Sequence, residues 1–318
     1  MQYKYIFGPV LSRRLGISLG VDLVPHKTCS LDCVYCECGK TTRLTREQKE
    51  YVKFSDIKRE LDHFWRCNND PDYITFSGSG EPTLNNRFGQ MIEYIKNQKP
   101  YMKTAVLTNS TLLDDPAVRE ALLKADLVIP SLDAVSEKAF VKINRPDKGL
   151  DINEMIDGIE LFAREYNGEI WIEVFVLPDF NDSESDLVLL KEAIQKIDPD
   201  LIQLNTLDRP GSVSGIKPAS KSELERVLKI LRFDNVEIIA NVNENIKAAP
   251  IMEMEDITAA VLKTISRRPC TKQDLIQLLG VGKRALEKQI SLLEHKKIII
   301  GKCRERGVFY KTIKDVDV

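Results

Sequence analysis

Residues 29–36 read CSLDCVYC and place Cys29, Cys33 and Cys36 in one short loop with the spacing C-x3-C-x2-C. The loop follows an apolar run, residues 17–24, which predicts a buried strand. Three thiolates that converge from one loop can hold three corners of a four-iron, four-sulfur cube and leave the fourth iron without a protein ligand. Such an open iron offers a place for a substrate or a cofactor to chelate.

Other uses of these thiols stay open. A structural zinc site takes four ligands and usually draws a second cysteine pair from further along the chain. Cys270 and Cys303 lie far downstream and form no C-x2-C pair, while Cys38 is so near Cys36 that the two would crowd a tetrahedral zinc ion. Cys38 could instead donate a hydrogen atom or pack the loop. The spacing favours a three-thiolate cluster, with zinc or incidental thiols as the alternatives.

The composition is ordinary for a soluble globular protein, with 43% hydrophobic and 30% charged residues among 318. No apolar run approaches the roughly 20 residues that a membrane span needs. The first residues also lack the apolar core and cleavage site of a secretory signal. We therefore expect a cytoplasmic protein that contacts no membrane. Seven cysteines in a reducing compartment favour metal binding over a disulfide framework.

Strand-like and helix-like patterns alternate along residues 1–245. Most of the strand-like runs are near-continuously apolar, as in parallel strands that are covered on both faces. Six strand–helix units in series predict an α/β fold with a parallel sheet, either open or curled into a barrel, whose ligands gather at the carboxyl ends of the strands. The six runs are residues 17–24, 73–77, 103–108, 127–132, 169–177 and 201–205, and a possible edge strand follows at 236–240.

The pattern changes after residue 245, where residues 241–255 read as a linker. Three helical segments with a glycine-containing turn before the third, followed by two β-like runs, predict a small winged helix-turn-helix domain within residues 246–318. Residues 251–318 carry 14 Lys and Arg against 9 Asp and Glu, whereas residues 1–250 carry 32 against 39. This asymmetry predicts two domains with different partners.

A glycine-rich segment closes the second predicted strand. Residues 76–84 read FSGSGEPTL. Gly78 and Gly80 let backbone carbonyl groups approach a ligand closely, and the Glu81 carboxylate can pair with an ammonium group. By itself such a turn is weak evidence for a binding site, and its position beside the cysteine loop strengthens it.

Polar residues also end the third and fourth predicted strands. Asn109 follows the third, and Ser131 and Asp133 follow the fourth. Asn109 and Asp133 could cap the next helices instead of contacting a ligand. In order, the cysteine loop with Tyr35 before its last cysteine, the glycine turn and these strand ends resemble the motifs of the radical S-adenosylmethionine (SAM) superfamily.

This resemblance covers about the first 245 residues and implies a core domain that is a partial (β/α)6 TIM-like barrel. It implies a 4Fe-4S cluster and SAM as cofactors, and an external flavodoxin- or ferredoxin-like electron donor. Reductive cleavage of SAM would yield a 5′-deoxyadenosyl radical that abstracts hydrogen from a substrate. The implied metal ligands are Cys29, Cys33 and Cys36, and the implied SAM contacts are Tyr35, Gly78, Gly80, Glu81, Asn109, Ser131 and Asp133.

A narrower resemblance connects residues 7–16 and 143–146, FGPVLSRRLG and INRP, with bacterial relatives of the wyosine-forming tRNA-modifying synthases. Those enzymes use a second cluster bound by upstream cysteines. No cysteine precedes Cys29 here, and no lysine is identifiable as a Schiff-base former. The resemblance therefore supports the fold and the SAM site but not the substrate.

The basic C-terminal domain leaves three functions open. Its cations could meet the phosphates of RNA, and the leading hypothesis is a radical SAM enzyme that acts on RNA, for example in tRNA modification, or on another macromolecule recruited by this domain. The same domain could dock a protein or peptide, with a peptide, protein or small metabolite as the substrate. An iron–sulfur redox sensor that reads DNA ranks last, because a sensor needs no SAM-like glycine turn. The cations in question are Lys283, Arg284, Lys288, Arg304 and Arg306.

Overall fold

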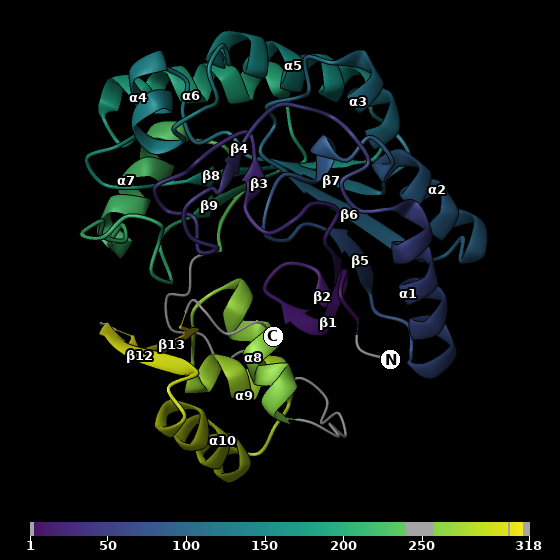
Figure 1. Cartoon of the computed structure of the whole chain (residues 1–318). Helices are drawn as coiled ribbons and strands as arrows, with labels where there is room; N and C mark the ends of the chain where they lie inside the picture. The colour runs from purple at the N-terminus through teal and green to yellow at the C-terminus, as the bar shows by residue number, and fades with distance from the viewer. Residues whose placement is uncertain (1–2, 240–256, 305, 314–318) are drawn as a thin grey trace.

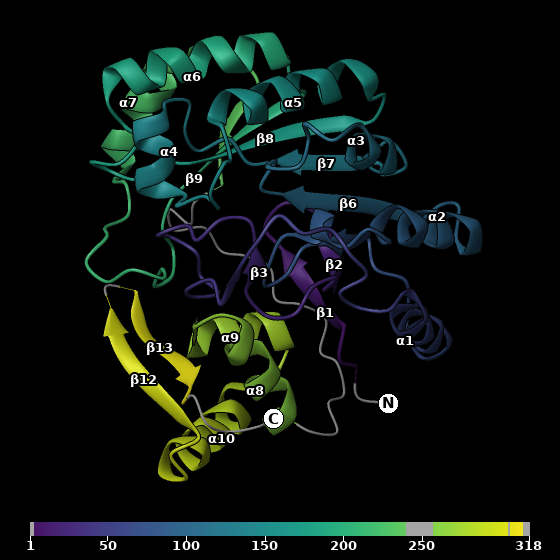
Figure 2. The ribbon, with the colours of Figure 1, turned by 45° about the horizontal axis from the view of Figure 1, so that its top comes forward.

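The computed structural model describes residues 3–239, 257–304 and 306–313. Its main feature is an eight-stranded sheet that curves into an open, partial barrel (Figures 1 and 2). β1 runs antiparallel to β2, and every later pair of neighbours is parallel. In spatial order the strands are β1 (Ile6–Ser12), β2 (Gly16–Val21), β5 (Tyr73–Phe76), β6 (Lys103–Thr108), β7 (Leu127–Pro130), β8 (Glu169–Phe175), β9 (Leu201–Asn205) and β10 (Val236–Ile238).

The mostly parallel sheet confirms the predicted α/β fold. Each of the six predicted strands corresponds to one strand of the sheet, and β10 is the edge strand. β1 was not predicted, because Gly8 and Pro9 interrupt its apolar pattern. The register pairs Val21 of β2 with Phe76 of β5, so the cysteine loop and the glycine turn leave the sheet side by side.

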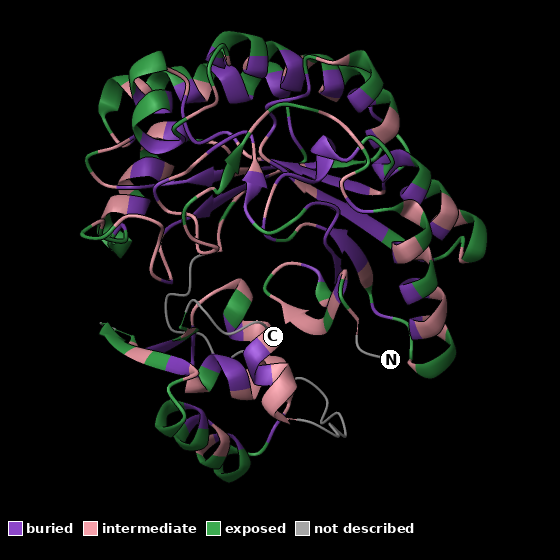
Figure 3. Ribbon diagram, in the orientation of Figure 1, coloured by how far each residue is buried: buried purple, intermediate pink, exposed green. Residues whose placement is uncertain are grey.

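Helices cover the outer face of the sheet and bury one side of each helix against it (Figure 3). α3 has a well-formed start, since the Asp115 side chain accepts a hydrogen bond from Ala117 N and Pro116 is the first helical residue. In the described parts of the chain, no helix is long and apolar enough to cross a membrane. These helices are α1 (Phe54–Cys67), α2 (Phe88–Gln98), α3 (Pro116–Leu122), α4 (Glu137–Ile143), α5 (Ile152–Glu165), α6 (Glu184–Ile197) and α7 (Lys221–Leu231).

The C-terminal unit has a separate apolar core, built around Leu275, Leu286 and Ile290. Its three helices and hairpin follow the predicted order, and a short strand, β11, joins the hairpin in a three-stranded antiparallel sheet. The predicted linker and the domain boundary near residue 245 lie outside the described residues, so the boundary stays a prediction. The elements are α8 (Ile257–Arg267), β11 (Cys270–Thr271), α9 (Lys272–Leu279), α10 (Lys283–His295), β12 (Ile299–Arg304) and β13 (Gly307–Thr312).

Polar contacts join the C-terminal unit to the barrel. The ammonium group of Lys263 donates to the carbonyl oxygens of Tyr3 and Ile6, at 2.7 and 3.0 Å. Arg267 forms an ion pair with Asp22, just beyond the end of β2. α8 therefore lies against the first hairpin of the barrel, next to the strand that leads into the cysteine loop (Figure 1).

Candidate metal centre

The loop that contains the three cysteines crosses the carboxyl ends of the strands. It begins at β3 (Thr28–Cys29), which pairs with β4 (Arg43–Leu44). The end of α4 braces it, because Val34 N donates to Ile143 O at 2.9 Å and Asp32 N donates to Asn144 O at 3.0 Å. The 143–146 segment therefore holds the backbone of the cysteine loop in place.

A side-chain nitrogen lies at hydrogen-bonding distance from the sulfur of each of the three cysteines. Asn109 Nδ2 is 3.4 Å from Cys29 Sγ, and Asn144 Nδ2 is 3.4 Å from Cys33 Sγ. Lys27 Nζ is 3.0 Å from Cys36 Sγ. N–H donors stabilise a thiolate, which is the form of cysteine that binds metal. The donor set therefore fits a centre that takes three thiolates.

The thiols differ in how easily they lose a proton. Burial raises the pKa of Cys29 to about 12 and also raises that of Cys33. The hydrogen bond from Cys38, together with the Lys27 ammonium group, lowers the pKa of Cys36 to about 6. In the described parts of the chain, no three His, Cys, Asp or Glu side chains converge closely enough to hold a single metal ion. A four-iron cube is larger than one ion and takes thiolates that stand further apart.

The glycine turn packs directly on the cysteine loop. Gly78 has φ of +130°, and a Cβ atom there would meet Asp22 Oδ1 at 1.6 Å. A Cβ atom on Gly80 would meet the carbonyl oxygen of Thr28 at 2.1 Å. Two backbone hydrogen bonds join the segments, from Lys27 N to Ser79 O at 2.8 Å and from Glu81 N to Thr28 O at 3.1 Å. Only glycine permits this close approach at the two positions.

Glu81 lies beneath the turn and is 2% exposed. Its Oε1 atom accepts hydrogen bonds from Thr83 N, Thr83 Oγ1 and Thr108 Oγ1, at 3.1, 2.7 and 2.7 Å. Its Oε2 atom accepts one from Asn109 N at 2.7 Å. Burial raises the pKa of this carboxyl group. Glu81 thus joins the ends of β5 and β6 and fixes the backbone of Asn109, whose side chain reaches Cys29.

Asp133 is the centre of a second buried network. It accepts hydrogen bonds from the Tyr35 hydroxyl group, from Asn144 Nδ2 at 2.8 Å and from Phe175 N at 2.9 Å. The Tyr35 ring stacks on Phe175 with centroids 3.8 Å apart. Burial raises the pKa of Asp133 to about 6. Ser131 lies nearby at the end of β7, where its carbonyl oxygen accepts from Ser110 Oγ at 2.9 Å. Tyr35 of the cysteine loop and Asp133 after β7 are therefore brought together, and Ser131 lies two residues before Asp133.

Several residues of this region were not predicted from the sequence. Lys27 contacts Cys36 and was not singled out. Asn144, named only within the 143–146 motif and given no role, contacts both Cys33 and Asp133. Glu173 was also missed. It forms a two-pronged ion pair with Arg14, at 2.8 Å for each bond, and accepts from Asn205 Nδ2 at 2.8 Å. The available signal for Glu173 was a carboxylate in the interior of the strand EIWIEVF, whose other interior residues are apolar.

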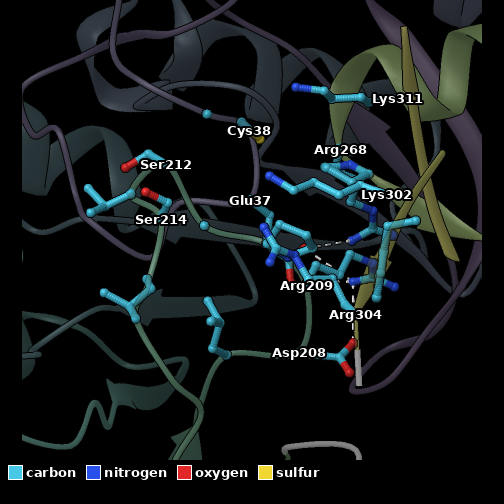
Figure 4. Close-up of a pocket in the computed structure, with 18 of the residues that line it drawn as sticks. Glu37, Cys38, Asp208, Arg209, Ser212, Ser214, Arg268, Lys302, Arg304 and Lys311 are labelled. Carbon is cyan, nitrogen blue, oxygen red and sulfur yellow. Dashed lines mark hydrogen bonds and ion pairs between the residues drawn. The ribbon is translucent and has the colours of Figure 1, made fainter. Parts of the chain in front are cut away.

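A groove of about 1350 Å³ opens beside the cysteine loop (Figure 4). Its walls are residues 37–40 of that loop, residues 206–219 after β9, residues 265–269, and the β12–β13 hairpin. Arg209 Nη1 lies 3.1 Å from Glu37 Oε2, and Arg306 Nη1 lies 2.8 Å from Asp208 Oδ1. The groove therefore lies between the barrel and the C-terminal unit.

Residues 23–190 match the sequence profile of the radical SAM superfamily. A UPF0026 protein of Helicobacter pylori is 34% identical over 93% of this chain and 94% of its own length. The chain is also 36% identical over 97% of its length to a protein of Brachyspira hyodysenteriae called GTPase Obg, of which it spans 44%. The chain thus covers less than half of that relative.

Three solved structures share the fold at low sequence identity. A radical SAM methyltransferase from Sphaerobacter thermophilus superposes with a TM-score of 0.54 at 16% identity, over 71% of this chain and 67% of that one. TYW1 with a lysine–pyruvate adduct bound gives 0.51 at 16% identity, over 71% and 75%. Streptococcus suis SuiB bound to SAM gives 0.50 at 19% identity, over 70% and 50%.

The likeness to these structures shows the fold alone, including the likeness to TYW1. The superfamily match shows the chemistry, because radical SAM enzymes use a 4Fe-4S cluster and SAM and need a reductant. The zinc alternative for the cofactor is thereby set aside. This chain belongs to the radical SAM superfamily and, within it, to the UPF0026 family.

Proposed function

We propose that Cys29, Cys33 and Cys36 hold the 4Fe-4S cluster of a radical SAM enzyme. The observation that carries this proposal is the side-chain nitrogen at hydrogen-bonding distance from each of the three sulfurs, in a loop braced by α4. When bound, the cluster supplies the electron that cleaves the sulfonium bond of SAM to yield a 5′-deoxyadenosyl radical for hydrogen abstraction. The residues of this chain position the reactants and exclude water.

We also propose that SAM lies between the glycine turn and the Asp133 network. Backbone groups of Gly78 and Gly80 would face its amino group, and the two backbone hydrogen bonds that hold this turn beside the cysteine loop support that placement. Glu81 and Asn109 would contribute on the same side. Because Glu81 is buried and already accepts four hydrogen bonds, we give it the further role of fixing the Asn109 backbone.

Tyr35, Ser131 and Asp133 would line the opposite side of the SAM site. The stacking of Tyr35 on Phe175 supports this placement, since it fixes the ring directly before Cys36. Asp133 holds the hydroxyl group of Tyr35 and the amide group of Asn144. One carboxylate thus orients a residue of the cysteine loop and a residue at the end of α4.

For the C-terminal unit we propose a winged helix that contacts nucleic acid, with RNA as the first candidate substrate. The order of its helices and hairpin and its basic composition support this proposal. Docking of a protein or peptide is the alternative, with a peptide, protein or metabolite as the substrate. The electron would come from a flavodoxin- or ferredoxin-like protein.

The cluster proposal is tested by anaerobic reconstitution of the full chain. We expect about four irons per chain and release of 5′-deoxyadenosine when SAM and a reductant are added. Replacing any one of Cys29, Cys33 and Cys36 by serine should abolish both the iron binding and the release of 5′-deoxyadenosine. Cys67→Ser is the matched control, because that thiol is exposed on α1, and it should change neither. Full iron binding in the Cys33→Ser variant would refute the ligand assignment.

A further inference from the structure

One face of the β12–β13 hairpin forms a wall of the groove. Side chains alternate between the two faces of a strand, so Ile300, Lys302 and Arg304 share one face. Across the hairpin, Lys302 pairs with Phe309 and Ile300 pairs with Lys311, which puts those residues on the same face. All five line the groove, where Figure 4 shows Lys302, Arg304 and Lys311.

The carboxylates that face this wall already form ion pairs with arginines. The carboxylates among the described lining residues are Glu37 and Asp208. Glu37 lies 3.1 Å from Arg209 and 3.9 Å from Arg268, and Arg306 pairs with Asp208. Although burial alone would raise the pKa of Glu37, these arginines hold it below its usual range.

Five further cations of the groove are exposed to solvent. None of them forms an ion pair with a carboxylate among the described residues, so their charge is available to a ligand. Their long side chains stand on three different segments that surround one opening. They are Lys40, Lys217, Lys302, Arg304 and Lys311.

We propose that this groove binds the phosphodiester backbone of a nucleic-acid strand and leads it to the cysteine loop. The inference rests on the proposed function and names the substrate surface for it. Two observations favour this ligand. The opening is larger than the roughly 300–1,000 Å³ that drug-sized ligands occupy. Its unpaired charge is positive on three of its four walls, as a polyanion requires.

The groove also lies where such a strand could react. Cys38 lines it two residues after Cys36, and its thiol group is 3.8 Å from the carbonyl oxygen of Gly78. A strand bound along Lys302 and Lys40 would therefore pass both loops that carry the superfamily motifs. By contrast, Lys283, Arg284 and Lys288 belong to α10 and are not among the residues that line the groove.

The test measures binding of a short fluorescent single-stranded RNA to the reconstituted full chain. The groove variant carries Lys302→Gln, Arg304→Gln and Lys311→Gln. The matched control carries Lys283→Gln, Arg284→Gln and Lys288→Gln on α10. It loses three exposed positive charges, as the groove variant does. DNA of the same sequence and a glutamate-rich peptide serve as further probes. Iron content is measured for every protein, so that failure of the cluster is seen separately.

We expect the groove variant to bind RNA or DNA roughly ten- to a hundred-fold more weakly near 0.1 M salt. Each lost phosphate contact removes about 0.7 from the slope of log K against log salt for single strands, so the slope of the groove variant should fall by about 2. The α10 control should match the parent in RNA affinity and in slope. No measurable nucleic-acid binding by an iron-loaded parent would overturn the groove proposal and leave the cluster proposal standing. Equal losses in both triple variants, or groove-dependent binding of the acidic peptide alone, would overturn it too.

Discussion

The contact between Gly80 and Thr28 makes a sharp prediction for Gly80→Ala. The added methyl group would lie 2.1 Å from Thr28 O and 2.7 Å from Val24 Cγ2, whereas carbon–oxygen contacts are ordinarily about 3.3 Å or longer. One segment must therefore move by about 1 Å. Two backbone hydrogen bonds hold the segments together, and the residue after Thr28 is Cys29. The movement must break a bond or displace that cysteine.

The expected cost combines two terms. Overpacking a tight site costs about 1–3 kcal/mol, and losing one backbone hydrogen bond costs about 1 kcal/mol more. We therefore expect Gly80→Ala to lower the free energy of unfolding by about 2–4 kcal/mol. We also expect it to bind clearly less iron than the parent after identical anaerobic reconstitution, because a shifted Cys29 no longer meets the other two thiols.

Gly282→Ala is the matched control. A Cβ atom at Gly282 meets nothing within 4 Å, and the residue has φ of −65°, which alanine adopts readily. The poorer helix cap and the smaller entropy of the unfolded chain largely cancel, so the change should stay within about 0.5 kcal/mol. Denaturant unfolding and iron analysis of both variants decide the matter. If Gly80→Ala matches the parent in both measurements, the turn does not position the cysteine loop.

Three further predictions test the polar networks. Arg14→Met should lower the free energy of unfolding by about 3 kcal/mol, because it leaves the largely buried Glu173 carboxylate without its ion-pair partner, and adding Glu173→Gln should restore most of the loss. Burial raises the pKa of Asp133 to about 6 in the folded chain, above the pKa of about 4 of an unfolded aspartate, so its ionisation destabilises the fold at neutral pH. The free energy of unfolding of the parent, compared with that of Asp133→Asn, should therefore rise by up to about 1.4 kcal/mol per pH unit as the pH falls from about 6 toward 4. Arg267→Gln should cost about 3 kcal/mol, because Asp22 keeps a buried charge without its partner.

Each of these outcomes has a measurable opposite. Denaturant unfolding compares Arg14→Met with the double variant that also carries Glu173→Gln. A double variant less stable than Arg14→Met would contradict the ion-pair explanation. A pH-independent difference between parent and Asp133→Asn would mean that the carboxyl group titrates alike in both states. Arg284→Gln, on the exposed face of α10, is the control for Arg267→Gln and should change stability by less than about 0.5 kcal/mol.

The sequence was sufficient to predict where the functional segments lie. Parallel strands carry their loops at one edge, so the cysteine loop, the glycine turn and the residues after β6 and β7 had to gather there. Burial within each helix is equally local, because residues at helical spacing, such as Leu61 and Phe64 of α1, share the buried face. These predictions needed no knowledge of which side chains touch.

The side-chain partners could not be predicted, because they depend on residues that are distant along the chain. Asn144 lies 111 residues from Cys33 and reads in the sequence as one polar residue near a helix end. Arg304 and Arg306 looked equivalent, as two cations on one charged turn. In the structure, Arg306 pairs with Asp208 and Asp274 from two different units, and Arg304 faces the groove. Only the packing of the two units separates their roles.

That packing changes how the C-terminal unit should be tested. Asp22 accepts a hydrogen bond from Ser79 N in the glycine turn and pairs with Arg267. Glu37 follows Cys36 and lies 3.9 Å from Arg268. The C-terminal unit thus contacts the segments beside both motif loops and forms a wall of the site. Deleting it would leave both carboxylates short of a partner, so lost activity after deletion would not distinguish recruitment from a damaged site. Point substitutions on the hairpin face leave these ion pairs intact and therefore isolate substrate binding.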